Sequence, residues 1–343
     1  MVAPPDPAPL AVVGGRLLTD LVDVTDDLAA LEGTGTWAVV LPTDGRPCCA
    51  RFRRSRPARP WPGPPWPGIP GGAAAWTTSL DGDAFRAGVA RIRSAIRDGD
   101  VYQVNLTRRL SAPAPPEADV AALGAALALG NPAPYSAVVR LPSHGVHVAS
   151  ASPELFLARD GTHVRSAPIK GTAATEDEFL DKDRAENVMI VDLVRNDLGR
   201  VCEWGSITVP SLCAVEQHPG LVHLVSEVEG RLRPGLGWAD AIAATFPPGS
   251  VTGAPKIAAL GMIDQLEPVP RGVYCGAVGW VDADAGRGAL NVAIRTFWLD
   301  EGQLHFGTGG GITWGSDPDG EWAETELKAA HLIDLASRGR LTR

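Results

Sequence analysis

Lys170 is the residue whose type and setting could do the most chemistry. It lies in the segment 168–172 (PIKGT), between a predicted strand at 162–167 and a predicted helix that begins at Glu176. The proline and glycine of this segment predict a stiff, tight turn. A lysine amine held partly away from water has a lowered pKa and can act as a nucleophile or base near neutral pH. A lone loop lysine is more often a solvated surface residue. Other features of the chain must therefore show whether Lys170 is catalytic.

Two acid pairs have the same spacing on two predicted helices. Asp183 and Glu186 are three residues apart on one helix, and Glu321 and Glu324 are three apart on the other. Residues at this spacing lie on one helix face, so each helix presents two carboxylates in one direction. A hard cation such as Mg²⁺, which takes oxygen ligands, would offset their repulsion, although solvated surface acids explain the pairs equally well. Lys328, seven residues after Glu321, could form an ion pair with these acids or contact a substrate.

Several other groups could bind an anion or line a site. The glycine cluster at 307–311 follows a predicted strand and could aim backbone N–H groups at a carboxylate or phosphate. Arg295, a charge on a largely apolar strand, could bind a carboxylate through two hydrogen bonds. Gln103 lies on the polar face of an alternating strand at 102–106, where its amide could line a site. His223 is a lone strand histidine, which is more often structural than catalytic.

The elements that must position these groups are mostly strands. Helices are expected at 81–99, 176–196, 238–244, 254–266 and 321–337. Strands are expected at 37–41, 102–106, 136–141, 145–150, 155–158, 207–210, 221–230, 273–282, 289–299 and 303–307. Strands that come in runs and hairpins, without strict alternation with helices, favour an α+β domain with large, mainly antiparallel sheets over a doubly wound parallel sheet.

The periodicity of the sequence also indicates the domain organisation. Strong helical periodicity begins after Asp81, a good N-cap residue, and ends at Gly99. The residues before it are weakly patterned, and 51–72 is rich in proline and glycine, which is typical of a linker. We therefore expect a short N-terminal region at 1–80, within the same globule as a catalytic domain at 81–340.

Charge and composition exclude several classes of protein. The formal net charge of −9 argues against a nucleic-acid or anionic-membrane partner, because both require a basic face. No apolar run approaches the length of a membrane span and no signal-peptide pattern is evident, so we expect a cytoplasmic protein. The five cysteines are odd in number and have no paired spacing, which argues against a disulfide frame or a zinc site.

Several long segments occur in the order in which one enzyme family carries them. They are DVYQVNL (100–106), SPELF (152–156), PIKGT (168–172), RAENVMIVDLVRNDLGRV (184–201), HLVSEVEG (223–230), FPPGSVTGAPK (246–256), 271–280, NVAIRT (291–296) and 309–329. With these motifs the chain resembles the chorismate-utilising enzymes over about 81–337, and among them the component I subunits of aminodeoxychorismate (para-aminobenzoate) synthases. The resemblance implies two large β-sheets packed together and edged by helices.

The resemblance also implies roles for individual residues. Glu186 and Glu324 would bind Mg²⁺, with Asp183 and Glu321 as outer-shell or water-mediated partners; Asp183 stands where many relatives have Glu. Glu154 would be the general acid that protonates the departing C4 hydroxyl of chorismate. The substrate would contact Arg295, Tyr274, the backbone amides around Gly310 and Gly311, and the cavity-lining residues His223, Gln103, Thr172 and Lys328.

Two positions select among the reactions of this family. Isochorismate and salicylate synthases have a lysine base where this chain has Gln103, and an amide cannot deprotonate an attacking water. Anthranilate synthases have alanine where this chain has Lys170. In the enzymes that it resembles most, this lysine is thought to add to C2 of chorismate as the C4 hydroxyl leaves, after which ammonia attacks C4 and expels the lysine. The expected product is 4-amino-4-deoxychorismate, towards para-aminobenzoate and folate; an anthranilate synthase subunit and a non-catalytic chorismate-binding scaffold are the alternatives.

The expected reaction needs a source of ammonia. None of the five cysteines lies in the Gly-x-Cys-x-Gly elbow typical of glutamine amidotransferases. The sequence therefore predicts a separate glutaminase subunit as partner. It contains no Leu-Leu-Glu-Ser motif of the kind that binds tryptophan in anthranilate synthases, so we expect no feedback by tryptophan.

Overall fold

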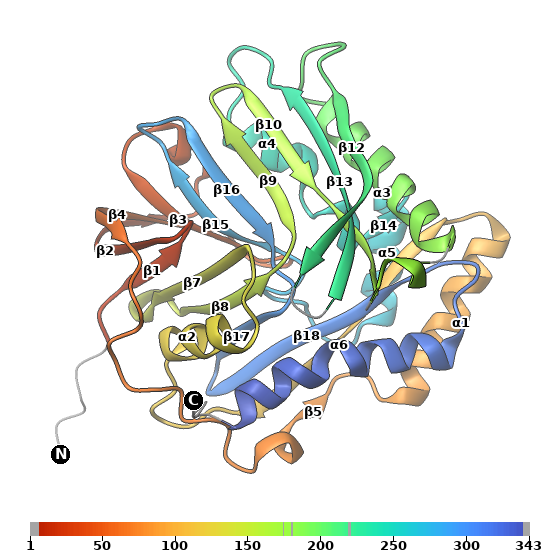
Figure 1. The fold of residues 1–343 in the computed structure, drawn as a ribbon, viewed down its shortest axis with the longest axis horizontal. Coiled ribbons are helices and arrows are strands. Elements are labelled where there is room, and N and C mark those ends of the chain that lie inside the picture. The colour runs from red at the N-terminus through yellow and green to blue at the C-terminus, as the bar shows by residue number, and fades with distance from the viewer. Residues whose placement is uncertain (1–6, 174, 180, 219–220, 339–343) are drawn as a thin grey trace.

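Strands dominate the fold, and helices flank them (Figure 1). The computed structural model describes residues 7–173, 175–179, 181–218 and 221–338. The strands are β1 (Leu10–Val13), β2 (Arg16–Thr25), β3 (Thr36–Leu41), β4 (Cys48–Pro57), β5 (Thr77–Thr78), β6 (Gln103–Pro113), β7 (Tyr135–Leu141), β8 (Val146–Ser152), β9 (Leu155–Asp160), β10 (His163–Ala167), β11 (Ile169–Ala173), β12 (Thr208–His218), β13 (Leu221–Arg231), β14 (Gly253–Ala254), β15 (Ala277–Asp282), β16 (Arg287–Val292), β17 (Thr296–Asp300) and β18 (Gln303–Ile312). The helices are α1 (Gly82–Asp98), α2 (Val120–Gly130), α3 (Asp181–Gly199), α4 (Trp238–Thr245), α5 (Lys256–Leu266) and α6 (Pro318–Arg338), with short 3-10 turns η1 (Leu28–Glu32), η2 (Gly72–Ala75), η3 (Pro142–His144), η4 (Glu176–Glu178) and η5 (Gly249–Val251).

The strands pair antiparallel in one continuous hydrogen-bonded order. It runs β12-β13-β10-β9-β16-β15-β3-β4-β2 and continues through β1 into β7-β8-β17-β18-β6. β11 pairs with β13, while β5 and β14 pair with β6. The predicted α+β class with mainly antiparallel strands is confirmed. The two expected sheets are joined into one network because β1 pairs with both β2 and β7.

Three apolar clusters hold the helices on this network. The largest joins the strands around β3 and β15 to α3 and α4, with Trp37 and Trp238 buried in it. The second lies between α2, α6 and the strands β7, β17 and β18, and contains Phe297 and Phe306. The third joins α1 and α5 to β6. Figure 1 shows α6 running along β18, so that one side of α6 faces the sheet.

Helix α1 forms where the sequence predicts it. The Asp81 side chain accepts a hydrogen bond from the Ala84 backbone N–H at 2.8 Å, which caps the first turn. Phe85 and Val89 are fully buried on its inner face. Gly99 ends the helix in the left-handed region at φ 88°, a conformation that glycine adopts at low cost.

The predicted linker at 51–72 is wrong in its first part. Residues up to Pro57 belong to β4, which pairs with both β2 and β3 and buries Phe52. The remainder packs against α6, because Trp66 and Ile69 are buried in the second cluster. The Trp66 indole N–H donates to the Ala336 carbonyl at 2.7 Å. The proline- and glycine-rich segment is therefore a fixed part of the core.

Other elements differ from the sequence-based expectations at their ends or in their existence. The helix expected at 176–196 begins as α3 at Asp181, after the separate turn η4. Helix α2 and the strands β1 and β2 were not predicted. The strand expected at 289–299 is broken, because Ala293 to Arg295 lie outside both β16 and β17.

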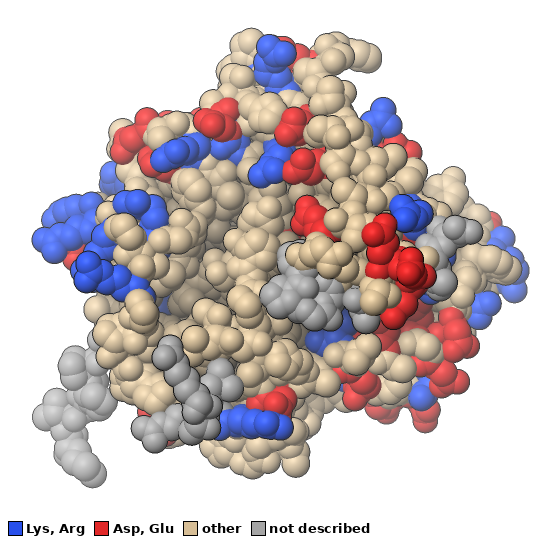
Figure 2. Space-filling view, viewed as in Figure 1, with Lys and Arg blue, Asp and Glu red and all other residues tan. Residues whose placement is uncertain are grey.

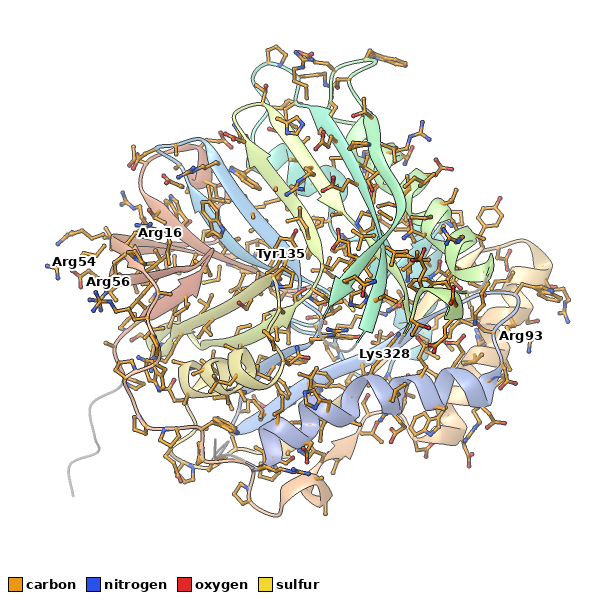
Figure 3. All side chains as sticks on the ribbon, viewed as in Figure 1. Arg16, Arg54, Arg56, Arg93, Tyr135 and Lys328 are labelled. Atoms are coloured by element: carbon orange, nitrogen blue, oxygen red, sulfur yellow. The ribbon has the colours of Figure 1, made fainter. Side chains whose placement is uncertain are left out.

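Charge is unevenly distributed on the face shown in Figure 2. Acidic side chains gather on the side of α1, α3 and α6, whereas basic side chains gather over β2 and β4. Arg16, Arg54 and Arg56 lie at this basic end, as Figure 3 shows. Within the described ranges, no helix combines the length and the apolar character needed to cross a membrane.

Candidate active site

Lys170 is positioned by a bulge in β11. Ile169 pairs with Val225 of β13, but the register then shifts, and the next pair is Thr172 with His223. Gly171 in the bulge has φ 87°, in the left-handed region that favours glycine. A bulge re-aims the side chain beside it. The expected tight turn is thus a bulge within a strand, and it presents the half-buried Lys170 side chain to the site.

The surroundings of Lys170 favour its neutral amine. Burial lowers the pKa of Lys170, and the positive charge of Lys328 lowers it further. The carboxylates of Glu186, Glu154 and Glu324 act in the opposite direction, yet the pKa stays below that of a solvated lysine. A lysine in this state can serve as a nucleophile.

Glu154 lies in the connection between β8 and β9, with 3% of its surface exposed. Burial raises the pKa of Glu154 to about 7, although hydrogen bonds from Ser250 and the Ile169 backbone and the charge of Lys170 all lower it. Its backbone is fixed, because the Val292 N–H donates to the Glu154 carbonyl at 3.0 Å. A carboxyl group with this pKa still carries its proton near neutral pH and can act as a general acid.

The two acid pairs meet across the site although α3 and α6 are far apart in sequence. Burial raises the pKa of Glu186, and the negative charges of Glu321 and Asp183 raise it further. Burial and the charge of Glu324 likewise raise the pKa of Glu321, whose Oε1 accepts a hydrogen bond of 2.5 Å from Ser316. The acids therefore repel one another in a partly buried cluster.

Lys328 compensates one of these acids. Its Nζ lies 2.7 Å from Glu324 Oε1 and donates to the Gly309 carbonyl at 3.1 Å. Burial raises the pKa of Glu324, but the charge and hydrogen bond of Lys328 and the charges of Lys182 and Lys170 together outweigh burial, so the pKa is lowered overall. Figure 3 shows Lys328 on the side of α6 that faces the strands. Of the two roles considered for Lys328, the structure places it with the acids.

The carboxylates suit a hard divalent cation in their chemistry. In the part of the chain that the structure describes, no three acidic, histidine or cysteine side chains converge on one point to form a metal site alone. Mg²⁺ commonly takes only one or two protein carboxylates and completes its octahedron with water and substrate oxygens. The pKa values of Glu186 and Glu321 are raised first by burial and further by neighbouring carboxylates, and a bound cation would offset both effects. The donor set therefore fits Mg²⁺ held by few protein ligands.

The glycine cluster on β18 brings the two faces of the site together. A Cβ atom on Gly310 would lie 3.0 Å from Glu321 Oε2, whereas one on Gly311 would lie 3.2 Å from Lys170 Nζ. The same Gly311 position is 2.1 Å from Nε2 of Gln103. Gln103 is only 1% exposed, and its Oε1 has no hydrogen-bond partner among the described residues. A buried, unsatisfied amide beside Lys170 indicates a ligand at this place.

Arg295 stands at the break between β16 and β17. Its φ is 51°, and its carbonyl accepts from the Ala151 N–H at 3.0 Å, which ties the break to β8. Burial lowers the pKa of Arg295, and no acidic side chain of the described chain forms an ion pair with it. A partly buried guanidinium without a carboxylate partner is suited to bind one from a substrate.

Tyr274 lies at a different glycine of β18 from the one that Lys170 approaches. Its ring covers Gly307, where a Cβ atom would lie 2.1 Å from the ring. Gly307 and Gly311 are four residues apart on one face of β18, which corresponds to about 13 Å along a strand. Burial and the neighbouring Cys275 raise the pKa of Tyr274 well above its usual value. The tyrosine lines a separate small pocket with Arg108 and other residues, so only an extended ligand could reach both ends.

His223 and Thr172 stand opposite each other in the β11–β13 pair. His223 is buried, with 2% of its surface exposed. The side chain of Thr172 lies outside the part of the structure that is described, so its predicted substrate contact remains a prediction. The backbone pairing places both residues next to the bulge that carries Lys170.

Three residues near the site were not singled out from the sequence. Ser250 hydrogen-bonds to Glu154, and Lys182 lies close enough to alter the pKa values of Glu186, Glu321 and Glu324. Asp197 forms a buried ion pair with Lys256 at 2.6 Å. Ser250 and Lys256 lie within the FPPGSVTGAPK motif, but a motif match does not tell which side chain faces the site.

A family model described as "chorismate binding enzyme" matches residues 70–334. The chain therefore belongs to the chorismate binding enzyme family.

Curated relatives of two kinds are similar to the chain. Aminodeoxychorismate synthase component 1 of Salmonella typhimurium is 39% identical over 272 residues, which cover 76% of this chain and 59% of that protein. Anthranilate synthase component 1 1 of Haloarcula marismortui is 43% identical over 267 residues, covering 74% and 53%. The chain thus spans little more than half the length of these relatives.

Solved structures share the fold over nearly the whole chain. The putative 2,3-dihydroxybenzoate-specific isochorismate synthase of Bacillus anthracis has a TM-score of 0.78 and 26% identity, covering 96% of both chains. Anthranilate synthase component I of Streptococcus pneumoniae has a TM-score of 0.75 and 26% identity, covering 95% of this chain and 89% of that one.

Proposed function

We propose that the chain makes 4-amino-4-deoxychorismate from chorismate and ammonia. The observation that carries this proposal is the pairing of Lys170, whose pKa is lowered, with Glu154, whose pKa is raised to about 7. The two pKa shifts are in the directions that favour a nucleophilic lysine and a protonated acid. Binding of chorismate alone would require neither group.

The first step forms a covalent intermediate. The neutral Nζ of Lys170 attacks C2 of chorismate, the two ring double bonds shift from C1=C2 and C5=C6 to C6=C1 and C4=C5, and the C4–O bond breaks. Glu154 gives its proton to the departing hydroxyl, which leaves as water. One difficult displacement is thereby replaced by two allylic ones. Arg295 and the amides near Gly311 would hold the carboxylates of the substrate during this step.

The second step delivers the amino group to C4. Ammonia bonds to C4, both double bonds shift back to C5=C6 and C1=C2, and the electron pair of the C2–N bond returns to Lys170 as its neutral amine. The Glu154 carboxylate takes a proton from the new ammonium group and regains its acid form. The sum is chorismate plus ammonia to aminodeoxychorismate plus water.

Glu186 and Glu324 would hold Mg²⁺, with Asp183 and Glu321 next to it. The bound ion would stabilise negative charge on the ring carboxylate of the substrate. The ammonia would come from a separate glutaminase subunit. The aminodeoxychorismate synthase relatives support this assignment, whereas the similarity to anthranilate synthases makes anthranilate formation the second candidate.

Product analysis separates the two candidates. Purified protein is incubated with chorismate, Mg²⁺ and concentrated ammonium at alkaline pH, so that no partner is needed. The proposal predicts a product that an added aminodeoxychorismate lyase converts to para-aminobenzoate. Anthranilate would overturn the role of Lys170 in setting the outcome. Without turnover under these conditions, the reading as a non-catalytic chorismate-binding scaffold gains weight.

A further inference from the structure

A small cavity has Glu154 in its wall. Its polar lining comes from Glu154, Ser166, Asp197, Thr245 and Ser250, and every residue around it is buried. The cavity measures about 20 Å³, which is room for one molecule the size of water. Chorismate is far too large for it.

The wall of this cavity is rich in hydrogen-bond acceptors. Asp197 Oδ2 accepts from Lys256 Nζ at 2.6 Å, and the same amine donates to the Thr245 carbonyl at 2.9 Å. The Thr245 hydroxyl already donates to the Ala241 carbonyl, which leaves its oxygen as an acceptor. Such a wall suits a molecule that donates several hydrogen bonds.

The Ser166 hydroxyl gives the cavity an uncommitted group. Ser166 is buried, with 7% of its surface exposed, on β10 next to the bulge of β11. No residue of the described chain forms a hydrogen bond with its side chain. A hydroxyl that lines a cavity is available to hydrogen-bond a small bound molecule.

We propose that this cavity holds the ammonia molecule that attacks C4 of the substrate. The inference rests on the proposed function, in which Glu154 protonates the hydroxyl on the carbon that then receives the amino group. The nucleophile must therefore approach beside Glu154, where the cavity lies. Ammonia has the size of water but donates three hydrogen bonds, which matches the acceptors of Asp197, Thr245 and Glu154.

Two variants of Ser166 test separately the space in the cavity and the hydrogen bond from the Ser166 hydroxyl. Ser166→Val fills the cavity with two methyl groups, and valine suits a strand. Ser166→Ala keeps the space and removes only the hydroxyl. For each variant, the KM for ammonium and the KM for chorismate are measured with the isolated chain, together with the melting temperature.

The expected result is a selective loss of ammonium affinity. Ser166→Val should raise the KM for ammonium at least about tenfold, equivalent to 1.4 kcal/mol, with the KM for chorismate and the melting temperature close to wild type. Ser166→Ala should give a smaller rise. If Ser166→Val instead leaves the KM for ammonium unchanged, the cavity holds a water molecule or nothing, and the inference is wrong. Product formation by the wild type is measured before the variants are tested. If the wild type makes no aminodeoxychorismate, the proposed function itself is wrong.

Discussion

Gln103 and Lys170 approach each other at one glycine. The amide nitrogen of Gln103 and the amine of Lys170 lie 2.1 and 3.2 Å from the place that a Cβ atom of Gly311 would occupy. Strands β6 and β18 are paired here, so Gln103 and Gly311 are fixed to each other by the sheet. The lysine enters from β11 on the opposite side of the site. The glycine therefore provides the space in which the lysine and the amide can meet a substrate.

Adding a single methyl group at this point should block turnover without unfolding the chain. Gly311→Ala would force the Gln103 amide, and with it Lys170, out of place, and a misplacement of about 1 Å can cost about a hundredfold in rate. The melting temperature should change little, because both contacts are ends of flexible side chains. Gly261→Ala on α5 is the matched control, since nothing lies within 4 Å of its Cβ position. Steady-state kinetics that show equal rates for both variants would contradict this account of Gly311.

Removing the amine of Lys170 should abolish the reaction but spare binding. We expect Lys170→Ala to lower kcat by at least about a hundredfold, because the covalent route is lost. The Kd for chorismate, measured by calorimetry, should change by less than this factor. Lys170→Arg is the control that keeps a positive charge but cannot be deprotonated to form a nucleophile. If either variant retains wild-type turnover, the covalent role of Lys170 is wrong.

The pKa of Glu154 predicts a pH dependence of activity. The acid must be protonated, so kcat/KM for chorismate at constant free ammonia should fall as the pH rises through about 7. Glu154→Gln should lower the rate by roughly 10²- to 10⁴-fold and remove this dependence. A rate profile whose high-pH limb is identical in both proteins would assign the titration to another group.

The same carboxyl should also affect stability in a predictable direction. Its pKa in the folded chain lies above the ordinary value of 4.5, so its contribution to stability is fully present below pH 4.5 and is lost as the pH rises to about 7. The free energy of unfolding of Glu154→Gln, relative to wild type, should therefore increase across this interval. Denaturant titrations at pH 5 and pH 8 measure it.

The acid cluster should bind Mg²⁺. Without the ion, repulsion among the acids should lower the melting temperature of the chain. Without the ion, Glu321→Gln should melt at the same temperature as wild type or higher, because it removes a charge that raises the pKa of Glu186. Mg²⁺ should raise the melting temperature of the wild type, and this shift should be smaller in the variant. Glu117→Gln, at an exposed position, is the control. Equal Mg²⁺ shifts in all three proteins would remove Glu321 from the metal site.

Much of the architecture could be predicted because its patterns are local. The N-cap Asp81 and the glycine that ends α1 each act within a few residues, so the sequence places this helix closely. The acid pairs could be found for the same reason, since their spacing defines a helix face. Helix α2 was missed because its residues are apolar or small on every side and show no helical periodicity.

The rest depends on contacts between distant segments. Ser250 and Glu154 meet only when β8 and η5 are brought together, and the sequence gives no sign of this contact. The left-handed conformation of Arg295 breaks a strand that alternation alone extends to residue 299. The role of Glu154 was inferred from the family resemblance, and its burial, which raises the pKa, is a property of the folded chain. The burial of Trp66 in the core was also missed, because the Pro- and Gly-rich composition around it predicted a linker.

The most direct test of the central claim is to observe the bond between Lys170 and the substrate. The protein is mixed with chorismate and Mg²⁺ without ammonia, quenched with acid and analysed by intact mass and peptide mapping. The account predicts a mass increase equal to chorismate minus one water, located on Lys170 and lost on addition of ammonium before the quench. If wild-type protein forms aminodeoxychorismate while no such adduct appears on Lys170 at any time, the covalent mechanism is contradicted.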